Sequence, residues 1–323
     1  MPDLPRPAQS PLEEPHLLLT RLRPRVRRAA LTALALSAVL FVACASQDEP
    51  QTGLPRVLAT TSVIAEFAQA VAGTDAEVVL LVPAGIDPHG YELPVDAVRE
   101  VVRADVVLVN GCGLEGGLLD VVLLNRDDDA LLAAVGGGSD AAASQEDAAR
   151  EQCDPHRWLS VPFAIGYVEA IAAALSAADP DAAAAYAQRA DALVVQMREL
   201  DAELRETLAV IADGSRRLVV FHDAFAHFAA AYGFELVASI LPTSPGQEPS
   251  AGAVADVVAA VRELGVAAVY YEPQFPSRVL ELVADETGAE LLALYSIPIP
   301  GAVDSYAELM RANARSLVAG LAR

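Results

Sequence analysis

Short apolar runs alternate with stretches of helical spacing along most of the chain. Seven runs rich in Val, Leu or Ile are each followed by a loop: 56–60, 77–82, 105–110, 217–222, 235–241, 267–272 and 290–296. Continuous apolar strands separated by helices are typical of parallel sheets that helices cover on both faces. The pattern therefore predicts an α/β protein with parallel sheets.

One long helix is expected to divide the sheets into two lobes. Residues 181–212 contain no Gly or Pro, and their large apolar residues recur at steps of three and four: Tyr186, Leu193, Met197, Leu200, Leu204, Leu208 and Ile211. A helix of this length extends ~48 Å, enough to reach across two lobes. We predict an N-terminal lobe at 55–180, a stiff linking helix at 181–212 and a C-terminal lobe at 213–323. Only small hinge motion between the lobes is expected.

A second segment interrupts the pattern in the first lobe. Residues 125–152 are polar, rich in Gly, Ala and Asp, and include three consecutive glycines at 136–138. Such composition is typical of loops. We interpret the segment as a mobile excursion from the fold.

The N-terminus has the pattern of a targeting segment. Five arginines between positions 21 and 28 precede an apolar run at 29–43, which is shorter than the ~20 residues of a spanning helix. The sequence around Cys44 resembles a bacterial lipoprotein cleavage box. We predict a signal peptide at 1–43, lipid attachment at Cys44 and a tether at 44–54. The alternative is an uncleaved membrane anchor, and either reading places the body of the protein outside the cytoplasm, at the cell surface or in a periplasm.

The charged residues exclude several functions. All 22 basic residues are Arg, so the lysine of a P-loop or of a Schiff-base enzyme is missing. The predicted signal peptide holds six Arg and three acidic residues, which leaves a net charge of −25 from Cys44 onward. A surface this acidic repels phosphate backbones, so we expect no nucleic-acid binding. It is compatible with a cationic ligand.

Histidines carry the candidate chemistry. Only five occur, and His16 lies in the predicted signal peptide. The tripeptide Asp-Pro-His appears at 87–89 and again at 154–156, where the proline stiffens the corner that presents His89 or His156. His222 ends an apolar strand, and ligands of open α/β sheets gather beyond such strand ends.

Two points stay open at this level. His227 follows His222 by five residues, about 500° along a helix, so we expect it to point away and to be structural. Three neutral imidazoles suit zinc, and one carboxylate would complete a tetrahedral site. The candidates for that carboxylate are Asp304, Glu272, Asp223 and Glu248.

These residues resemble the cluster A-I substrate-binding proteins of ABC transporters, which bind zinc or manganese. The similarity extends from about Val57 to Leu321. It rests on five segments in the family's order, namely 82–92, 104–115, 154–159, 221–225 and Asp304-Ser305-Tyr306 with Met310 and Asn313. Cys112 stands where the family more often has an ordinary apolar residue.

The resemblance implies a site and partners. Metal would lie in the cleft between the lobes, held by His89, His156, His222 and Asp304, while Glu272 would be structural. A histidine at position 222 matches the zinc binders of the family, whereas manganese binders have glutamate there. We accordingly expect a monomer that captures Zn²⁺ and passes it to the membrane permease of an ABC importer. The histidine-rich loop of many zinc members is missing, because residues 127–151 contain no histidine.

Other readings remain at this stage. A manganese- or iron-binding member of the same family is the nearest alternative. A surface adhesin with a structural metal is compatible with a lipid anchor. A zinc hydrolase would need an open ligand position, and the sequence has neither H-E-x-x-H nor G-x-S-x-G. Cys112 and Cys153 could form a disulfide or remain two separate thiols.

Overall fold

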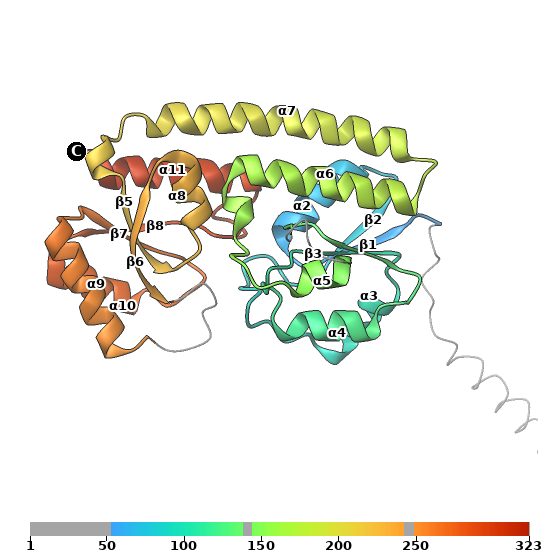
Figure 1. Ribbon diagram of the computed structural model, residues 1–323, viewed down its shortest axis with the longest axis horizontal. Coiled ribbons are helices and arrows are strands. Elements are labelled where there is room, and N and C mark those ends of the chain that lie inside the picture. Colours follow the sequence, from blue (N-terminus) through green and yellow to red (C-terminus); the bar gives the residue numbers. More distant parts are fainter. Residues whose placement is uncertain (1–52, 138–143, 242–248, 323) are drawn as a thin grey trace, which may run out of the picture. The chain divides into compact units, whose positions relative to one another are not determined.

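The computed structural model describes residues 53–137, 144–241 and 249–322. Residues Leu54–Arg323 form one compact unit (Figure 1). The predicted signal peptide and Cys44 lie outside the described residues.

The N-terminal lobe is built on a parallel sheet of four strands in the order β2-β1-β3-β4. The strands are β1 (Arg56–Ala59), β2 (Glu77–Leu80), β3 (Val106–Val109) and β4 (Leu131–Ala134). The helices are α2 (Ser62–Ala72), η3 (Val95–Ala97), α3 (Val98–Val102), α4 (Gly117–Asn125), α5 (Gln145–Arg150), η4 (Arg157–Leu159) and α6 (Val161–Ala178). All four residues of β3 are buried, as expected for a central strand that is covered on both faces.

The C-terminal lobe repeats this plan with a parallel sheet in the order β6-β5-β7-β8. Its strands are β5 (Arg217–His222), β6 (Glu235–Leu241), β7 (Ala268–Tyr271) and β8 (Glu290–Ala293). Its helices are η5 (Asp213–Ser215), α8 (Ala226–Tyr232), α9 (Ala251–Leu264), α10 (Arg278–Thr287) and α11 (Tyr306–Leu321). The expected α/β class with two parallel-sheet lobes is confirmed.

A long helix, α7 (Ala183–Leu208), runs along both lobes (Figure 1). It packs on α2 and α6 of the first lobe and on α11 of the second. One hydrophobic cluster continues through these helices and includes Phe67, Tyr167, Met197, Tyr306 and Leu317. Because the two lobes share this core, hinge motion at α7 would disrupt buried contacts, and the helix acts as a stiff support.

The helix is shorter than the 181–212 expected from the sequence. Asp179 accepts hydrogen bonds from the backbone N–H groups of Asp181 and Ala182, and this turn precedes the first helical residue. At the other end the chain leaves the helix after Leu208.

The interpretation of 125–152 as a mobile excursion was wrong for its described part. Residues 131–134 form β4, which pairs with β3, and 145–150 form α5, whose N-cap is the Ser144 hydroxyl. The run Leu-Leu-Ala-Ala is apolar but short, and half of it is alanine, which is depleted in strands, so its place beside β3 is determined by the sheet rather than by local propensity.

Cys112 and Cys153 form a disulfide, with their Cα atoms 4.7 Å apart. Cys112 has a φ of 54°, which is unusual for a residue other than Gly, and it lies between Gly111 and Gly113 in the loop after β3. The bond ties this loop to the segment that leads into Asp154-Pro155-His156.

Candidate metal centre

The two Asp-Pro-His corners are built in the same way. Asp87 Oδ1 accepts a hydrogen bond from the backbone N–H of His89 at 3.1 Å, and Asp154 Oδ1 accepts one from that of His156 at 3.1 Å. Each aspartate thereby closes a small turn over its proline, a local structure that Asp favours. The two histidines are therefore presented from rigid corners, His89 after β2 and His156 before η4.

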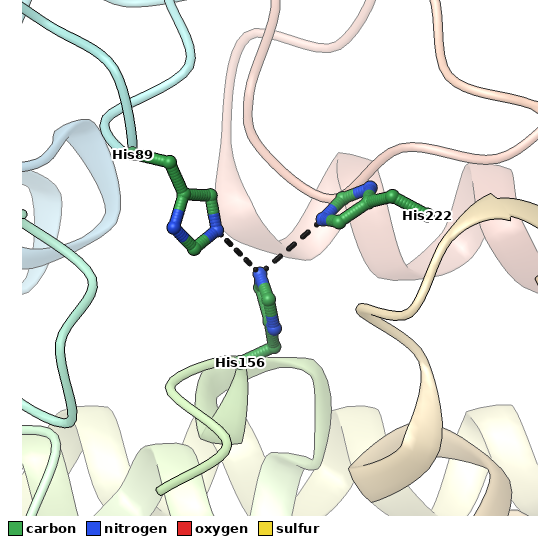
Figure 2. A group of neighbouring side chains, drawn as sticks. All are labelled: His89, His156 and His222. Carbon is green, nitrogen blue, oxygen red and sulfur yellow. Dashed lines mark hydrogen bonds between the residues drawn. The ribbon is translucent and has the colours of Figure 1, made fainter. Parts of the chain in front are cut away.

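His222 is the last residue of β5 and approaches from the other lobe. Figure 2 shows the three imidazoles converging through their Nε2 atoms. The Nε2 atom of His156 lies 3.1 Å from that of His89 and 3.4 Å from that of His222. The ligand atoms of the three histidines all lie within 4.8 Å of one another. The structure thus brings together the three histidines predicted from the sequence.

Carboxylates contact the Nδ1 atom, the ring nitrogen opposite Nε2, of two of these histidines. His156 Nδ1 lies 2.9 Å from Asp154 Oδ1, and His222 Nδ1 lies 2.5 Å from Glu272 Oε1. A carboxylate only accepts, so the proton of each ring is on Nδ1 and the lone pair of each Nε2 is free. Two lone pairs that face each other 3.4 Å apart are satisfied by a cation between them.

The spacing fits a bound transition metal. Tetrahedral ligands at the usual Zn–N distance of about 2.0–2.1 Å lie about 3.3–3.4 Å apart. The two Nε2 separations of 3.1 and 3.4 Å are close to this value.

Burial controls the charge of the site. Desolvation, and after it the neighbouring imidazoles of His156 and His222, lower the pKa of His89 to about 3. Desolvation also lowers the pKa of His156. For His222 desolvation again acts downward, but Glu272, with smaller contributions from Asp87 and Asp223, outweighs it and the pKa is raised. At neutral pH the rings of His89 and His156 are therefore neutral, as metal binding requires.

The wall of the site comes from both lobes. Trp158 packs its ring 5.3 Å from that of His156, and its Nε1 donates to the carbonyl oxygen of Ser296 at 2.7 Å across the lobe boundary. Glu272 Oε2 accepts from Gln274 Nε2 at 3.0 Å and from the Ser296 hydroxyl. This network fixes the Glu272 carboxylate and, through it, the orientation of His222.

The structure does not bring Asp304 into this group. Its side chain is exposed, and Oδ1 accepts from the backbone N–H of Gly301 at 2.6 Å, just before the start of α11. Asp304 lines a separate pocket with Ser62 and Glu66. Its assignment as fourth ligand rested on the resemblance alone and has no support from this geometry.

The other candidate carboxylates have different positions. Glu272 contacts the Nδ1 atom of a ligand histidine, so its role is to orient that ring. Asp223 follows His222, and its Oδ1 is buried without a hydrogen-bond partner among the described residues. Glu248 lies outside the described residues.

Sequence reasoning missed the position of His227. α8 begins at Ala226, so His222 and His227 do not share a helix and the expected angle between them does not apply. His227 Nε2 lies 3.2 Å from the carbonyl oxygen of Asp154 and 3.3 Å from its Oδ2. No local sequence signal indicates a contact between residues so distant in the chain.

The two lobes, the supporting helix and the three converging imidazoles define a two-lobed protein with a site suited to a metal ion. Residues 57–320 match the ZnuA family, described as zinc-uptake complex component A, periplasmic. The chain belongs to this family, which confirms the resemblance found in the sequence.

Individual relatives match most of the chain's length, and one solved structure shares its fold. The manganese-binding lipoprotein MntA of Halalkalibacterium halodurans is 29% identical over 294 residues, which are 88% of this chain and 96% of MntA. The iron ABC transporter substrate-binding lipoprotein MtsA of Streptococcus pyogenes is 28% identical over 310 residues, 92% of this chain and 99% of MtsA. The periplasmic zinc-binding protein TroA of Treponema pallidum superposes with a TM-score of 0.76 at 28% identity, covering 84% of this chain and all of TroA.

These relationships establish the general function. The protein is a metal-binding, substrate-binding component of an ABC transporter, and members of its family are solute-binding proteins rather than enzymes. Its expected location outside the cytoplasm is confirmed. Lipid attachment at Cys44 stays a prediction.

Proposed function

We propose that this protein captures Zn²⁺ between its lobes and delivers it to the membrane permease of its importer. The observation that carries the proposal is a set of three converging imidazoles, two of which, His156 and His222, have their Nδ1 atoms held by carboxylates. Imidazole suits zinc, whereas manganese prefers carboxylate, carbonyl and water oxygens. The nitrogen-rich set therefore favours zinc.

The relatives leave a second candidate. MntA is named for manganese and MtsA for iron, while TroA is named for zinc. Iron is also compatible with imidazole ligands, so Fe²⁺ is a stronger competitor than Mn²⁺ for this donor set. We expect the protein to act as a monomer, attached to the membrane through a lipid at Cys44.

Single substitutions test the ligand set. His89→Ala removes one of three ligands and should weaken zinc binding strongly, measured by competition with a chromophoric chelator. Asp304→Ala serves as the matched comparison, because Asp304 is a predicted ligand whose Oδ1 accepts a hydrogen bond from the backbone N–H of Gly301. We expect it to bind zinc like the wild type.

Two results would change the proposal. Unchanged zinc affinity in His89→Ala would remove the three-histidine site. A loss in Asp304→Ala as large as that in His89→Ala would restore Asp304 as a fourth ligand. Apo proteins with equal thermal unfolding midpoints would show that neither substitution acts by unfolding the chain.

A further inference from the structure

A histidine of the C-terminal lobe reaches the carboxylate that orients a ligand of the N-terminal lobe. His227 lies on α8, and its Nε2 contacts both the carbonyl oxygen and Oδ2 of Asp154, at 3.2 and 3.3 Å. Both partners are acceptors, so the ring proton is on Nε2 and is shared between them. About a quarter of each side chain is exposed, 24% for His227 and 25% for Asp154.

The two carboxylate oxygens of Asp154 contact histidines of different lobes. Oδ1 accepts from the backbone N–H of His156 at 3.1 Å and holds the Nδ1 of the same ring at 2.9 Å. Oδ2 faces His227. A carboxylate held at both oxygens has a fixed plane, and this plane sets the direction in which the His156 ring presents Nε2.

His227 is itself seated against the first lobe. Its ring lies 5.2 Å from that of Phe163 on α6, at an interplanar angle of 79°. The Arg157 guanidinium covers the Phe163 ring at 4.6 Å. The position of His227 therefore depends on α8 remaining packed beside η4 and α6.

We propose that His227 is a positioning residue. Through Asp154 and His156, it makes the retention of the metal depend on the contact between α8 and the N-terminal lobe. While the lobes are together, His227 fixes Asp154, and Asp154 fixes His156. When α8 moves away, Asp154 loses its second support and His156 loses its alignment, which promotes release of the ion. The inference rests on the proposed zinc site and adds a route by which a permease that shifts α8 away from η4 would release the zinc ion, without separating the core that the lobes share at α7.

Other contacts between the lobes provide a control. Glu66 on α2 accepts a hydrogen bond from the backbone N–H of Tyr306 at 2.8 Å, and no contact of Glu66 with the three histidines occurs in the described structure. Removing the Glu66 carboxylate weakens the lobe boundary without changing Asp154. Removing the His227 N–H changes Asp154 directly.

The test compares zinc release from the full-length protein and three variants. His227→Phe keeps a ring against Phe163 but has no N–H, His227→Gln restores a donor at similar reach, and Glu66→Ala breaks the separate lobe contact. Protein loaded with one zinc is mixed with excess chelator, and the dissociation rate is measured by stopped flow. Cobalt absorption spectra of the same proteins report the geometry of the ligand set.

We expect His227→Phe to release zinc roughly 3- to 10-fold faster, less than the roughly 10- to 100-fold effect of losing a ligand's direct partner. Its cobalt spectrum should change, while His227→Gln and Glu66→Ala should resemble the wild type in both measurements. Wild-type release from His227→Phe would overturn the inference, as would equally fast release from Glu66→Ala or His227→Gln. A wild-type protein that binds no zinc would instead contradict the proposed function.

Discussion

Replacing Glu272 by Gln tests how strongly a buried carboxylate supports a ligand histidine. Glu272 is 1% exposed, and its two oxygens are shared among His222, Gln274 and Ser296. Glutamine keeps the size of the side chain and removes its charge. The neutral amide oxygen accepts a weaker hydrogen bond from His222 Nδ1 than the carboxylate does. Where the amide nitrogen faces the ring, it donates to Nδ1 and the ring proton moves to Nε2, which then cannot bind metal.

The magnitude follows from this loss of the oriented tautomer. Removing the partner of a metal-ligating histidine typically weakens binding about 10- to 100-fold. At about 1.4 kcal/mol for each tenfold change, the expected loss is about 1.4–2.8 kcal/mol of binding free energy. Ser296→Ala is the matched control, because it removes one donor to Oε2 and leaves the charged Oε1 against His222. Its effect should be much smaller.

The assay is a zinc titration in competition with a chelator of known affinity, run on wild type, Glu272→Gln and Ser296→Ala under one set of conditions. Thermal unfolding of the apo proteins separates effects on folding from effects on the site. Equal zinc affinity for Glu272→Gln and wild type would refute the argument that the carboxylate sets the tautomer of His222.

Three further variants test the framework around the site. Replacing Cys112 and Cys153 by Ala removes a disulfide that spans 41 residues, and the chain-entropy model then predicts a free energy of unfolding lower by about 4 kcal/mol. Urea unfolding measures this loss, and an unchanged midpoint would contradict the prediction. Trp158→Phe leaves the buried Ser296 carbonyl without its indole donor and should cost about 1–3 kcal/mol in the same assay, whereas no loss would mean that the bond adds nothing to stability. Gly320→Ala places a Cβ 2.6 Å from the Tyr270 hydroxyl and 2.7 Å from the Ala268 Cβ, so α11 must shift at a cost of about 1–3 kcal/mol of stability. An equally stable variant would show that α11 accommodates the added methyl group freely.

Much of the fold could be predicted because its strands are strongly apolar. The central strands β1, β3, β5 and β7 are mostly buried, so each contains at least three consecutive apolar residues. β4 escaped prediction because it is a short edge strand with two alanines, located between polar segments. Its position depends on pairing with β3, which local sequence does not encode.

The site was predictable where one residue carries a local signal. The proline corners of His89 and His156 and the strand end at His222 are visible in the sequence, and the structure joins them. Asp304 illustrates the limit, because a carboxylate shortly before a helix is equally suited to accept backbone hydrogen bonds, and in the structure it does so. The role of His227 depends on the packing of one lobe against the other, so only three-dimensional contacts reveal it.

The measurement that tests the central claim most directly is a competitive metal titration of residues 45–323 after chelator treatment. Zinc and manganese are added separately and then against each other. The three-imidazole site predicts one zinc per chain and no displacement of zinc by excess manganese. Manganese binding as tight as zinc binding would contradict the account, because the three histidines would then not determine which metal the protein captures.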